Sequence, residues 1–221
     1  MTALLQQSRT EPVEITSDGA GLQGDLSLPP EATGLVLFAH GSGSSRTSPR
    51  NQYVAETLQQ EGLATLLLDL LTAEEEAVDV YTRQYRFDIP LLAKRLVAAT
   101  DWALADPRTA DLPIGYFGAS TGAAAALIAA VDRPEAVRAV VSRGGRPDMA
   151  GPALAHVQAP TLLIVGGYDT PVIALNKEAF DQLPDGKEMM IVPRATHLFE
   201  EPGALEEVAR LAGDWFRQYL K

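Results

Sequence analysis

Residues 113–122 read PIGYFGASTG, an apolar run that ends in a serine placed between two glycines. The run at 113–117 predicts a buried strand, and the alanine-rich segment at 121–131 predicts a helix. A serine at such a strand-to-helix corner has two interpretations. Ser120 can cap the helix with its hydroxyl group. Alternatively, the sharp turn exposes it as a nucleophile, in the pattern Gly-x-Ser-x-Gly that residues 118–122 match.

Strands and helices are predicted to alternate along the rest of the chain. Continuous apolar runs suit central parallel strands covered on both faces, and they occur at 35–39, 64–70, 113–117, 139–142, 161–165 and 189–192. Helical patterns occur at 50–61, 89–105, 121–131, 171–183 and 204–219. Near the start, 13–16 and 22–29 predict an antiparallel hairpin with a turn at 17–21. The order predicts a single α/β domain over residues 1–221 with a mostly parallel sheet.

One connection is longer than the others. Residues 71–88 contain three consecutive glutamates at 74–76 and exceed the usual length of a loop. Two interpretations stay open for this segment: a solvated surface loop, or a small lid over a site.

The composition restricts the classes of partner. The 221 residues are 46% hydrophobic and 21% charged, as in a globular protein. The net charge is −11 without any basic stripe, which disfavours nucleic acids and anionic membranes as partners. No apolar run approaches the roughly 20 residues that cross a bilayer, and residues 1–12 do not have the pattern of a secretory signal. We therefore expect a cytoplasmic protein with a small-molecule partner.

The chain has no cysteine, which excludes disulfides, thiolate metal sites and cysteine nucleophiles. Its three histidines are not clustered in the spacing of a metal site. The sequence therefore predicts neither a metal nor a cofactor.

A serine nucleophile needs a histidine as base and a carboxylate that orients it. For a Gly-x-Ser-x-Gly corner, the expected order along the chain is serine, acid, histidine. Of the three histidines, only His197 follows both Ser120 and a suitable acid. His40 ends an earlier strand, and His156 precedes the run at 161–165, where we expect a partly buried structural role. Asp169 is the only carboxylate in the loop after 161–165, and its alternative role is to cap the next helix. The predicted catalytic triad is Ser120, Asp169 and His197.

Acyl transfer also needs N–H donors for the developing oxyanion. Thr121 follows the nucleophile and supplies the first donor. The loop after the first central run reads HGSG at 40–43 and lies at the carboxyl end of its strand, where α/β sheets bind ligands. We assign the second donor to Ser42 and expect His40 and Gly41 to contact the substrate; the alternative is a merely flexible turn.

Three arginines lie close to these loops in the sequence. Arg46 follows the HGSG loop, and Arg143 and Arg146 follow the run at 139–142. Guanidinium groups there suit a carboxylate or phosphate on the substrate. The alternative is salt bridges with some of the 29 acidic residues.

The chain resembles the α/β-hydrolase superfamily, and within it the dienelactone-hydrolase-like branch. The resemblance extends from Val13 to Tyr219 and is carried by residues 40–43, the motif at 118–122, Asp169 in GGYD and His197 in RATHLF. It implies an eight-stranded sheet with an antiparallel second strand, little or no cap, and the same triad. Dienelactone hydrolases use a cysteine nucleophile that this chain lacks, so ester hydrolysis carries over from the resemblance while lactone specificity stays open. The longer run at 40–51 is similar to a bacterial subgroup whose members are fused to phosphoribosyltransferase domains.

The function predicted from these features is hydrolysis of small to medium carboxylic esters, including thioesters or lactones, through an acyl-enzyme. Two alternatives stay open. An acyltransferase with the same triad would turn over faster with an alcohol or thiol acceptor than with water. A non-catalytic ligand-binding module of hydrolase fold would not react with a fluorophosphonate probe.

Overall fold

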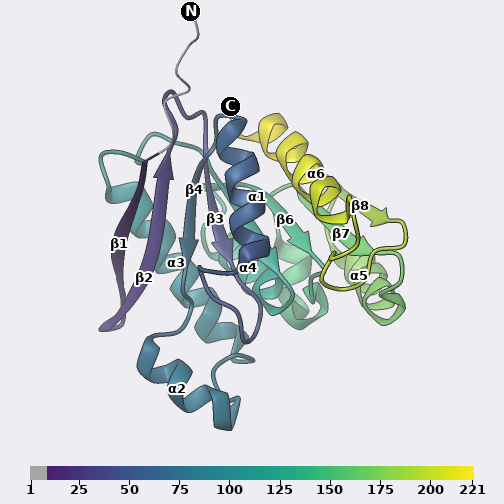
Figure 1. The fold of residues 1–221 in the computed structure, drawn as a ribbon. Helices are drawn as coiled ribbons and strands as arrows, with labels where there is room; N and C mark the ends of the chain where they lie inside the picture. The colour runs from purple at the N-terminus through teal and green to yellow at the C-terminus, as the bar shows by residue number, and fades with distance from the viewer. Residues whose placement is uncertain (1–8) are drawn as a thin grey trace, which may run out of the picture.

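The structure, a computed structural model, describes residues 9–221. An eight-stranded sheet with the order β1-β2-β4-β3-β5-β6-β7-β8 forms its centre (Figure 1). The strands are β1 (Arg9–Ser17), β2 (Ala20–Leu28), β3 (Leu35–Ala39), β4 (Ala64–Leu68), β5 (Ile114–Ala119), β6 (Val137–Arg143), β7 (Thr161–Gly166) and β8 (Lys187–Val192). From β4 to β8 all neighbours are parallel, so the predicted mostly parallel sheet is confirmed. The prediction for residues 1–12 falls largely on residues 1–8, outside the described part.

The first two strands form the predicted antiparallel hairpin, and β2 is also antiparallel to β4. The turn is shorter than predicted, because Ser17 pairs with Ala20 and only Asp18 and Gly19 remain outside the ladder. Both turn residues have positive φ, 48° and 81°. Such a two-residue turn matches the twist of the strands that it joins.

Helices cover both faces of the sheet. Helices α1 (Pro49–Gln60) and α6 (Ala204–Tyr219) lie on one face, the nearer face in Figure 1. Helices α3 (Ile89–Ala105), α4 (Thr121–Asp132) and α5 (Thr170–Gln182) lie on the other. Side chains of β3 alternate between the two cores: Val36 and Phe38 pack towards α1 and α6, while Leu35 and Leu37 pack towards α3 and α4. Burial on both faces explains why β3 is apolar at every residue.

The strand order reverses direction at β3. After β3 the chain adds β4 on one side, and later adds β5 on the other. Helix α1 after β3 and helix α4 after β5 therefore cover opposite faces, and the loops that lead to them diverge. A crevice at the carboxyl ends of such strands is where open α/β sheets bind ligands. The HGSG loop (40–43) and the corner at 118–122 both lie at these carboxyl ends.

Three expectations are corrected. The run in β8 was predicted to be covered on both faces, but β8 is an edge strand that pairs only with β7, and Met190 and Ile191 are about 40% exposed. His156 was expected to be partly buried, yet it is exposed at the end of a short 3-10 helix, η1 (Pro147–His156). Residues 71–88 are no simple loop, because they contain helix α2 (Ala73–Thr82), which projects from the carboxyl edge of the sheet (Figure 1).

Candidate active site

Ser120 forms the corner between β5 and α4 with φ 50° and ψ −121°. Such a conformation costs a non-glycine residue about 1–3 kcal/mol. The Ser120 N–H donates to the carbonyl of Arg143 at 3.3 Å, and the Ser120 carbonyl accepts from the N–H groups of Ala123 and Arg146 at 3.1 and 3.0 Å. The hydroxyl makes no capping hydrogen bond to α4. The side chain is thus not used as a helix cap, which favours the interpretation as a nucleophile.

The two glycines of the corner are required by close approach of the backbone. A Cβ atom at Gly118 would lie 2.5 Å from Cα of Ala123, at the start of α4. A Cβ atom at Gly122 would lie 2.1 Å from the carbonyl oxygen of Ala39, at the end of β3. Any side chain at these two positions would push α4 away from the sheet. The glycines of the motif therefore set how close the serine lies to the loop after β3.

Asp169 and His197 are brought together from two different loops. Asp169 is the N-cap residue of α5, but its side chain makes no capping hydrogen bond. Its Oδ2 instead accepts a hydrogen bond from Nδ1 of His197 at 2.7 Å. A proton held on Nδ1 leaves Nε2 unprotonated, which is the form that a general base needs. The carboxylate is largely buried and the imidazole ring is 38% exposed, so the ring is the accessible member of the pair.

Backbone contacts hold these loops in place. The N–H of Gly167 donates to Val192 at 2.8 Å, and the N–H of Tyr168 donates to Ala195 at 2.9 Å. These bonds tie the loop after β7 to the loop after β8, so the positions of Asp169 and His197 are coupled.

Gly144 connects the histidine loop to the serine. Its Cβ would lie 3.5 Å from Nδ1 of His197, and it follows Arg143, whose carbonyl binds the Ser120 N–H. Within residues 9–221, no hydrogen bond joins Ser120 directly to His197. Catalytic hydrogen bonds are often long before substrate binds. The triad as a working unit therefore stays a prediction.

The loop after β3 packs directly against the candidate nucleophile. A Cβ atom at Gly41 would lie 3.0 Å from Cβ of Ser120 and 3.2 Å from the carbonyl oxygen of Ala119. In the described chain, neither the Ser42 N–H nor the Thr121 N–H is used in the hydrogen bonds of turns and loops. The loop after β3 and the first residue of α4 thus each hold an unused N–H group next to Ser120 in the fold or in the sequence, and an oxyanion site requires two such donors.

His40 is buried and both of its ring nitrogens are engaged. Nε2 accepts from the N–H of Leu70 at 3.0 Å, so the proton resides on Nδ1, which donates to the carbonyl of Gly41 at 2.9 Å. Burial lowers the pKa of His40 and keeps the ring neutral. These contacts fix the conformation of the HGSG loop. A direct contact of His40 or Gly41 with substrate stays a prediction.

Two of the three candidate arginines pair with carboxylates of the protein. Arg46 pairs with Asp69, and also with Asp25 at 3.2 Å. Arg146 pairs with Asp148 at 2.8 Å. These pairs agree with the salt-bridge alternative. Among residues 9–221, Arg143 forms no such pair and donates instead to the neutral Oδ1 of Asn51 at 3.1 Å.

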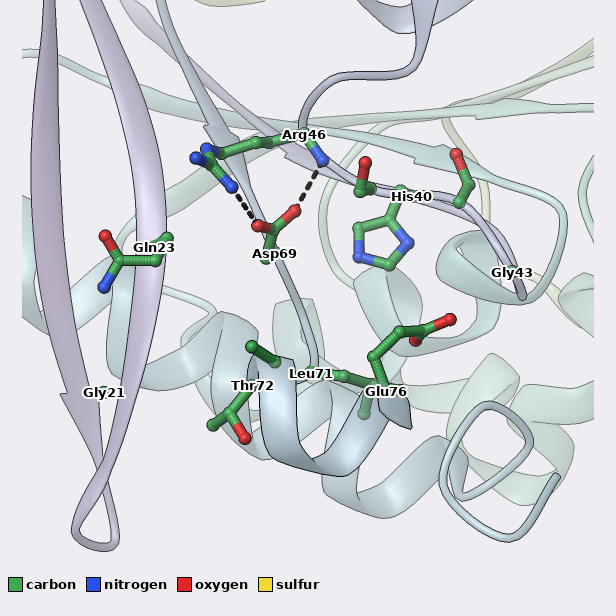
Figure 2. Close-up of a pocket in the computed structure, with 12 residues that line it drawn as sticks. Gly21, Gln23, His40, Gly43, Arg46, Asp69, Leu71, Thr72 and Glu76 are labelled. Carbon is green, nitrogen blue, oxygen red and sulfur yellow. Dashed lines mark hydrogen bonds and ion pairs between the residues drawn. The ribbon is translucent and has the colours of Figure 1, made fainter. Parts of the chain in front are cut away.

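A cavity of about 390 Å³ lies beside the HGSG loop, between β2, the end of β4 and the start of α2 (Figure 2). In Figure 2 Arg46 reaches Asp69 from one side, and Glu76 of α2 lies across from them, below His40. Ser120 is not among the residues that line this cavity. The cavity is therefore adjacent to the predicted oxyanion loop and separate from the serine.

Helix α2 is tied firmly to the body. Thr72 and Glu75 form a reciprocal capping box at its start, a signal that the spacing Thr-x-x-Glu carries in the sequence and that sequence reasoning missed. Glu75 also pairs with Arg95, which is 3% exposed. Asp79 is fully buried and binds Arg86, whose guanidinium lies against the HGSG loop, 3.3 Å from where a Cβ of Gly43 would be. The segment thus forms one wall beside the candidate site.

Among residues 9–221, no three side chains of His, Cys, Asp or Glu are grouped so that they could hold a metal ion. None of the helices in that range has the length and apolar character to cross a membrane.

Comparisons with known proteins identify the fold and a close relative. A crystal structure of a dienelactone hydrolase from Anabaena variabilis is 63% identical, with a TM-score of 0.96 over 98% of this chain and 100% of that one. Est1E from Butyrivibrio proteoclasticus has the same fold at 18% identity, with a TM-score of 0.77 over 94% of this chain and 98% of its own. No family model matches.

Among curated proteins, a "Putative phosphoribosyl transferase" of Mycobacterium tuberculosis is 57% identical over 212 residues, which is 96% of this chain. The match covers 47% of that protein. The chain thus spans about half the length of the curated relatives that it matches.

Proposed function

Because this chain belongs to the dienelactone hydrolase family of the α/β-hydrolase fold, we propose that it hydrolyses carboxylic esters through Ser120, His197 and Asp169. The observation that carries the proposal is the side chain of Asp169. Asp169 occupies the N-cap position of α5, but its carboxylate binds Nδ1 of His197 instead of capping the helix. This arrangement is expected when a carboxylate orients a catalytic histidine. Ser120, at the corner between β5 and α4, has a strained backbone and a hydroxyl group that does not cap the helix. This hydroxyl group is the one on which His197 would act.

The proposed reaction begins with attack of Ser120 Oγ on the acyl carbon. His197 Nε2 takes the hydroxyl proton and then delivers it to the leaving alcohol. Asp169 stabilises the imidazolium that forms between these two transfers, at a hydrogen-bond distance of 2.7 Å. The N–H groups of Ser42 and Thr121 bind the negative oxygen of the tetrahedral intermediate.

The second half of the reaction releases the acyl group. Water attacks the acyl-enzyme, His197 accepts its proton, and Ser120 leaves with that proton restored. Small to medium acyl groups are expected, including those of thioesters or lactones, because the connection between β6 and β7 is only the short helix η1 and adds no cap domain.

The test is hydrolysis of p-nitrophenyl esters from acetyl to octanoyl by the native chain and by Ser120→Ala. Ser142→Ala serves as a matched control, since its hydroxyl is buried without a partner on the neighbouring strand β6. The proposal predicts that activity disappears in Ser120→Ala and persists in Ser142→Ala, and that a fluorophosphonate probe labels only chains that retain Ser120. Equal activity in all three proteins would contradict the proposed triad. Addition of an alcohol acceptor tests the alternative of acyl transfer, which would raise turnover above the rate in water.

A further inference from the structure

Asp79, in helix α2, is fully buried, and its side chain holds the segment that follows the helix. Oδ1 of Asp79 accepts the N–H groups of Tyr85 and Arg86 at 2.7 and 3.2 Å, and Oδ2 accepts a hydrogen bond from Nε of Arg86. Burial alone would raise the pKa of the Asp79 carboxyl group, but these hydrogen bonds outweigh it and hold that pKa below its ordinary value. Asp79 is therefore ionised, and it fixes both the backbone and the side chain of Arg86.

The guanidinium group of Arg86 connects this carboxylate to the HGSG loop. Its Nη2 donates to the backbone carbonyl of Asp79 at 3.1 Å, so Asp79 holds Nη2 as well as Nε. Its Nη1 lies 3.3 Å from where a Cβ atom of Gly43 would be, and outside residues 42–44 no other atom of the described chain lies within 4 Å of that point. The Arg86 side chain is only 17% exposed, so it packs against the loop instead of extending into solvent.

Residues 41–44 of this loop form a turn that presents the predicted oxyanion donor. The Ser44 N–H donates to the carbonyl of Gly41 at 3.1 Å, and Gly43, the third residue of the turn, has a φ of 69°. A positive φ at the third residue of a turn favours glycine. Ser42 lies at the exposed tip, so the orientation of the turn sets the direction of the Ser42 N–H group.

The other side of the turn is held through the start of the same segment. His40 Nδ1 donates to the carbonyl of Gly41 at 2.9 Å, and His40 Nε2 accepts the N–H of Leu70 at 3.0 Å. The chain from Leu70 to Arg86 therefore supports the turn on both sides of Ser42.

We propose that Asp79 and Arg86 are positioning residues for the predicted oxyanion site. Asp79 fixes the guanidinium group of Arg86, and this group fixes the turn from which the Ser42 N–H is presented. An N–H donor that is oriented before the reaction needs no rearrangement when the oxyanion forms. In this role neither residue contacts the reacting atoms. The inference rests on the proposed ester hydrolysis and adds to it a role for residues 71–88, as a support of the oxyanion loop.

The alternative is that the pair only stabilises α2. Buried ion pairs contribute little net stability compared with well-packed hydrophobic residues. The start of α2 also has its own capping box, formed by Thr72 and Glu75. The experiments below therefore separate the orientation of the turn from the stability of the fold.

The first experiment measures kcat and KM for a p-nitrophenyl ester, per active site counted by complete labelling with a fluorophosphonate. Asp79→Asn removes the charge that holds the guanidinium group and keeps an oxygen for the N–H groups of Tyr85 and Arg86. In Asp79→Asn and in Arg86→Met, kcat should fall about 10- to 100-fold, below the ~10²–10³ expected for outright loss of a donor. KM should change by less than about twofold, because the oxyanion contact is made only in the transition state.

Three further variants complete this experiment. The double variant Asp79→Asn/Arg86→Met should be no slower than Arg86→Met, because the two residues act as one unit. Arg86→Lys keeps a cation for Asp79 and should restore part of kcat. The control Arg83→Met removes an exposed arginine from the same segment and should leave kcat unchanged. Arg86→Met alone leaves a buried carboxylate unpaired; if it does not fold, Asp79→Asn and the double variant provide the test. A native kcat per labelled site in these variants, with a lowered Tm, would show that the pair is structural and would overturn the proposal.

A second experiment does not depend on turnover, so that failure of the proposed function and failure of the positioning role are distinguishable. It measures, by NMR, hydrogen exchange of the Ser44 amide, whose N–H closes the turn. In Asp79→Asn this exchange should be about tenfold faster than in the native chain, the factor that corresponds to one hydrogen bond, while Arg83→Met should exchange at the native rate. Faster exchange in a protein that hydrolyses no ester would support the positioning of the turn and contradict the proposed function. An unchanged Ser44 exchange rate in Asp79→Asn would overturn the positioning role.

Discussion

A methyl group added at Gly122 would lie 2.1 Å from the carbonyl oxygen of Ala39 and 2.5 Å from that of His40. Both contacts are with backbone, which cannot rotate away as a side chain can. The contact must open by about 1 Å to reach a tolerable separation. Because α4 begins at Thr121, this opening moves the serine corner away from β3 and from the loop that carries Ser42.

The size of the effect follows from that displacement. A misplacement of about 1 Å at reacting groups costs about 100-fold in rate, and overpacking costs about 1–3 kcal/mol of stability. For a domain of this length, each kcal/mol lowers Tm by about 2–4 °C. In Gly122→Ala we therefore expect kcat for a p-nitrophenyl ester to fall about 100-fold, and Tm to fall by about 2–12 °C.

The assay pairs ester kinetics with thermal melts and uses Ala129→Gly as the control. Ala129 lies in the same helix, is fully buried and is two turns from the corner. Glycine there costs about 1 kcal/mol in helix propensity, in addition to the lost methyl contacts, and introduces no clash. Its Tm should fall while kcat stays near the native value. A normal kcat in Gly122→Ala, or an equal fall of kcat in both variants, would refute the expected displacement of the serine corner.

Three further predictions concern other parts of the structure. Asp169→Asn should lower kcat by about 10³- to 10⁴-fold with little change in Tm, because His197 loses the carboxylate that stabilises its charged form; steady-state ester kinetics that match the native chain would contradict this. Burial lowers the pKa of His40 below its ordinary 6.5, so the unfolded chain binds this proton more readily and the free energy of unfolding should decrease as the pH drops through about 6.5. Urea melts at pH 7.5 and 5.5 should show this loss, and His40→Gln should show less of it. Arg95→Met leaves Glu75 without its buried partner, so limited proteolysis should cut within α2 faster than in the native chain; equal rates would show that the pair does not hold α2.

Much of the fold and of the candidate site follows from local sequence. The continuous apolar runs other than that of β8 predicted strands buried on both faces, and Gly118 with Gly122 required a close corner after β5. In a parallel sheet all carboxyl ends meet at one edge. The order of the loops alone was therefore enough to bring Ser120, Asp169 and His197 to the same region.

Where the sequence left two interpretations, long-range packing decided between them. An aspartate that precedes a helix can cap it, and only the bonds between the loops after β7 and β8 show that the Asp169 carboxylate contacts His197 instead. The exposure of β8 depends on its place at the edge of the sheet, a property of strand order that its own residues do not express.

The environments of the arginines also depend on tertiary packing rather than on local sequence. Arg46, Arg143 and Arg146 had equal standing as candidates in the sequence. Their environments differ because residues distant in the chain supply the carboxylates: Asp69 reaches Arg46, whereas Asn51 is what α1 presents to Arg143. Residue type and spacing therefore determined the fold and the candidate catalytic groups. The tertiary structure alone decided which charge remained without a partner, since pairing depends on distances between segments that are not neighbours in the sequence.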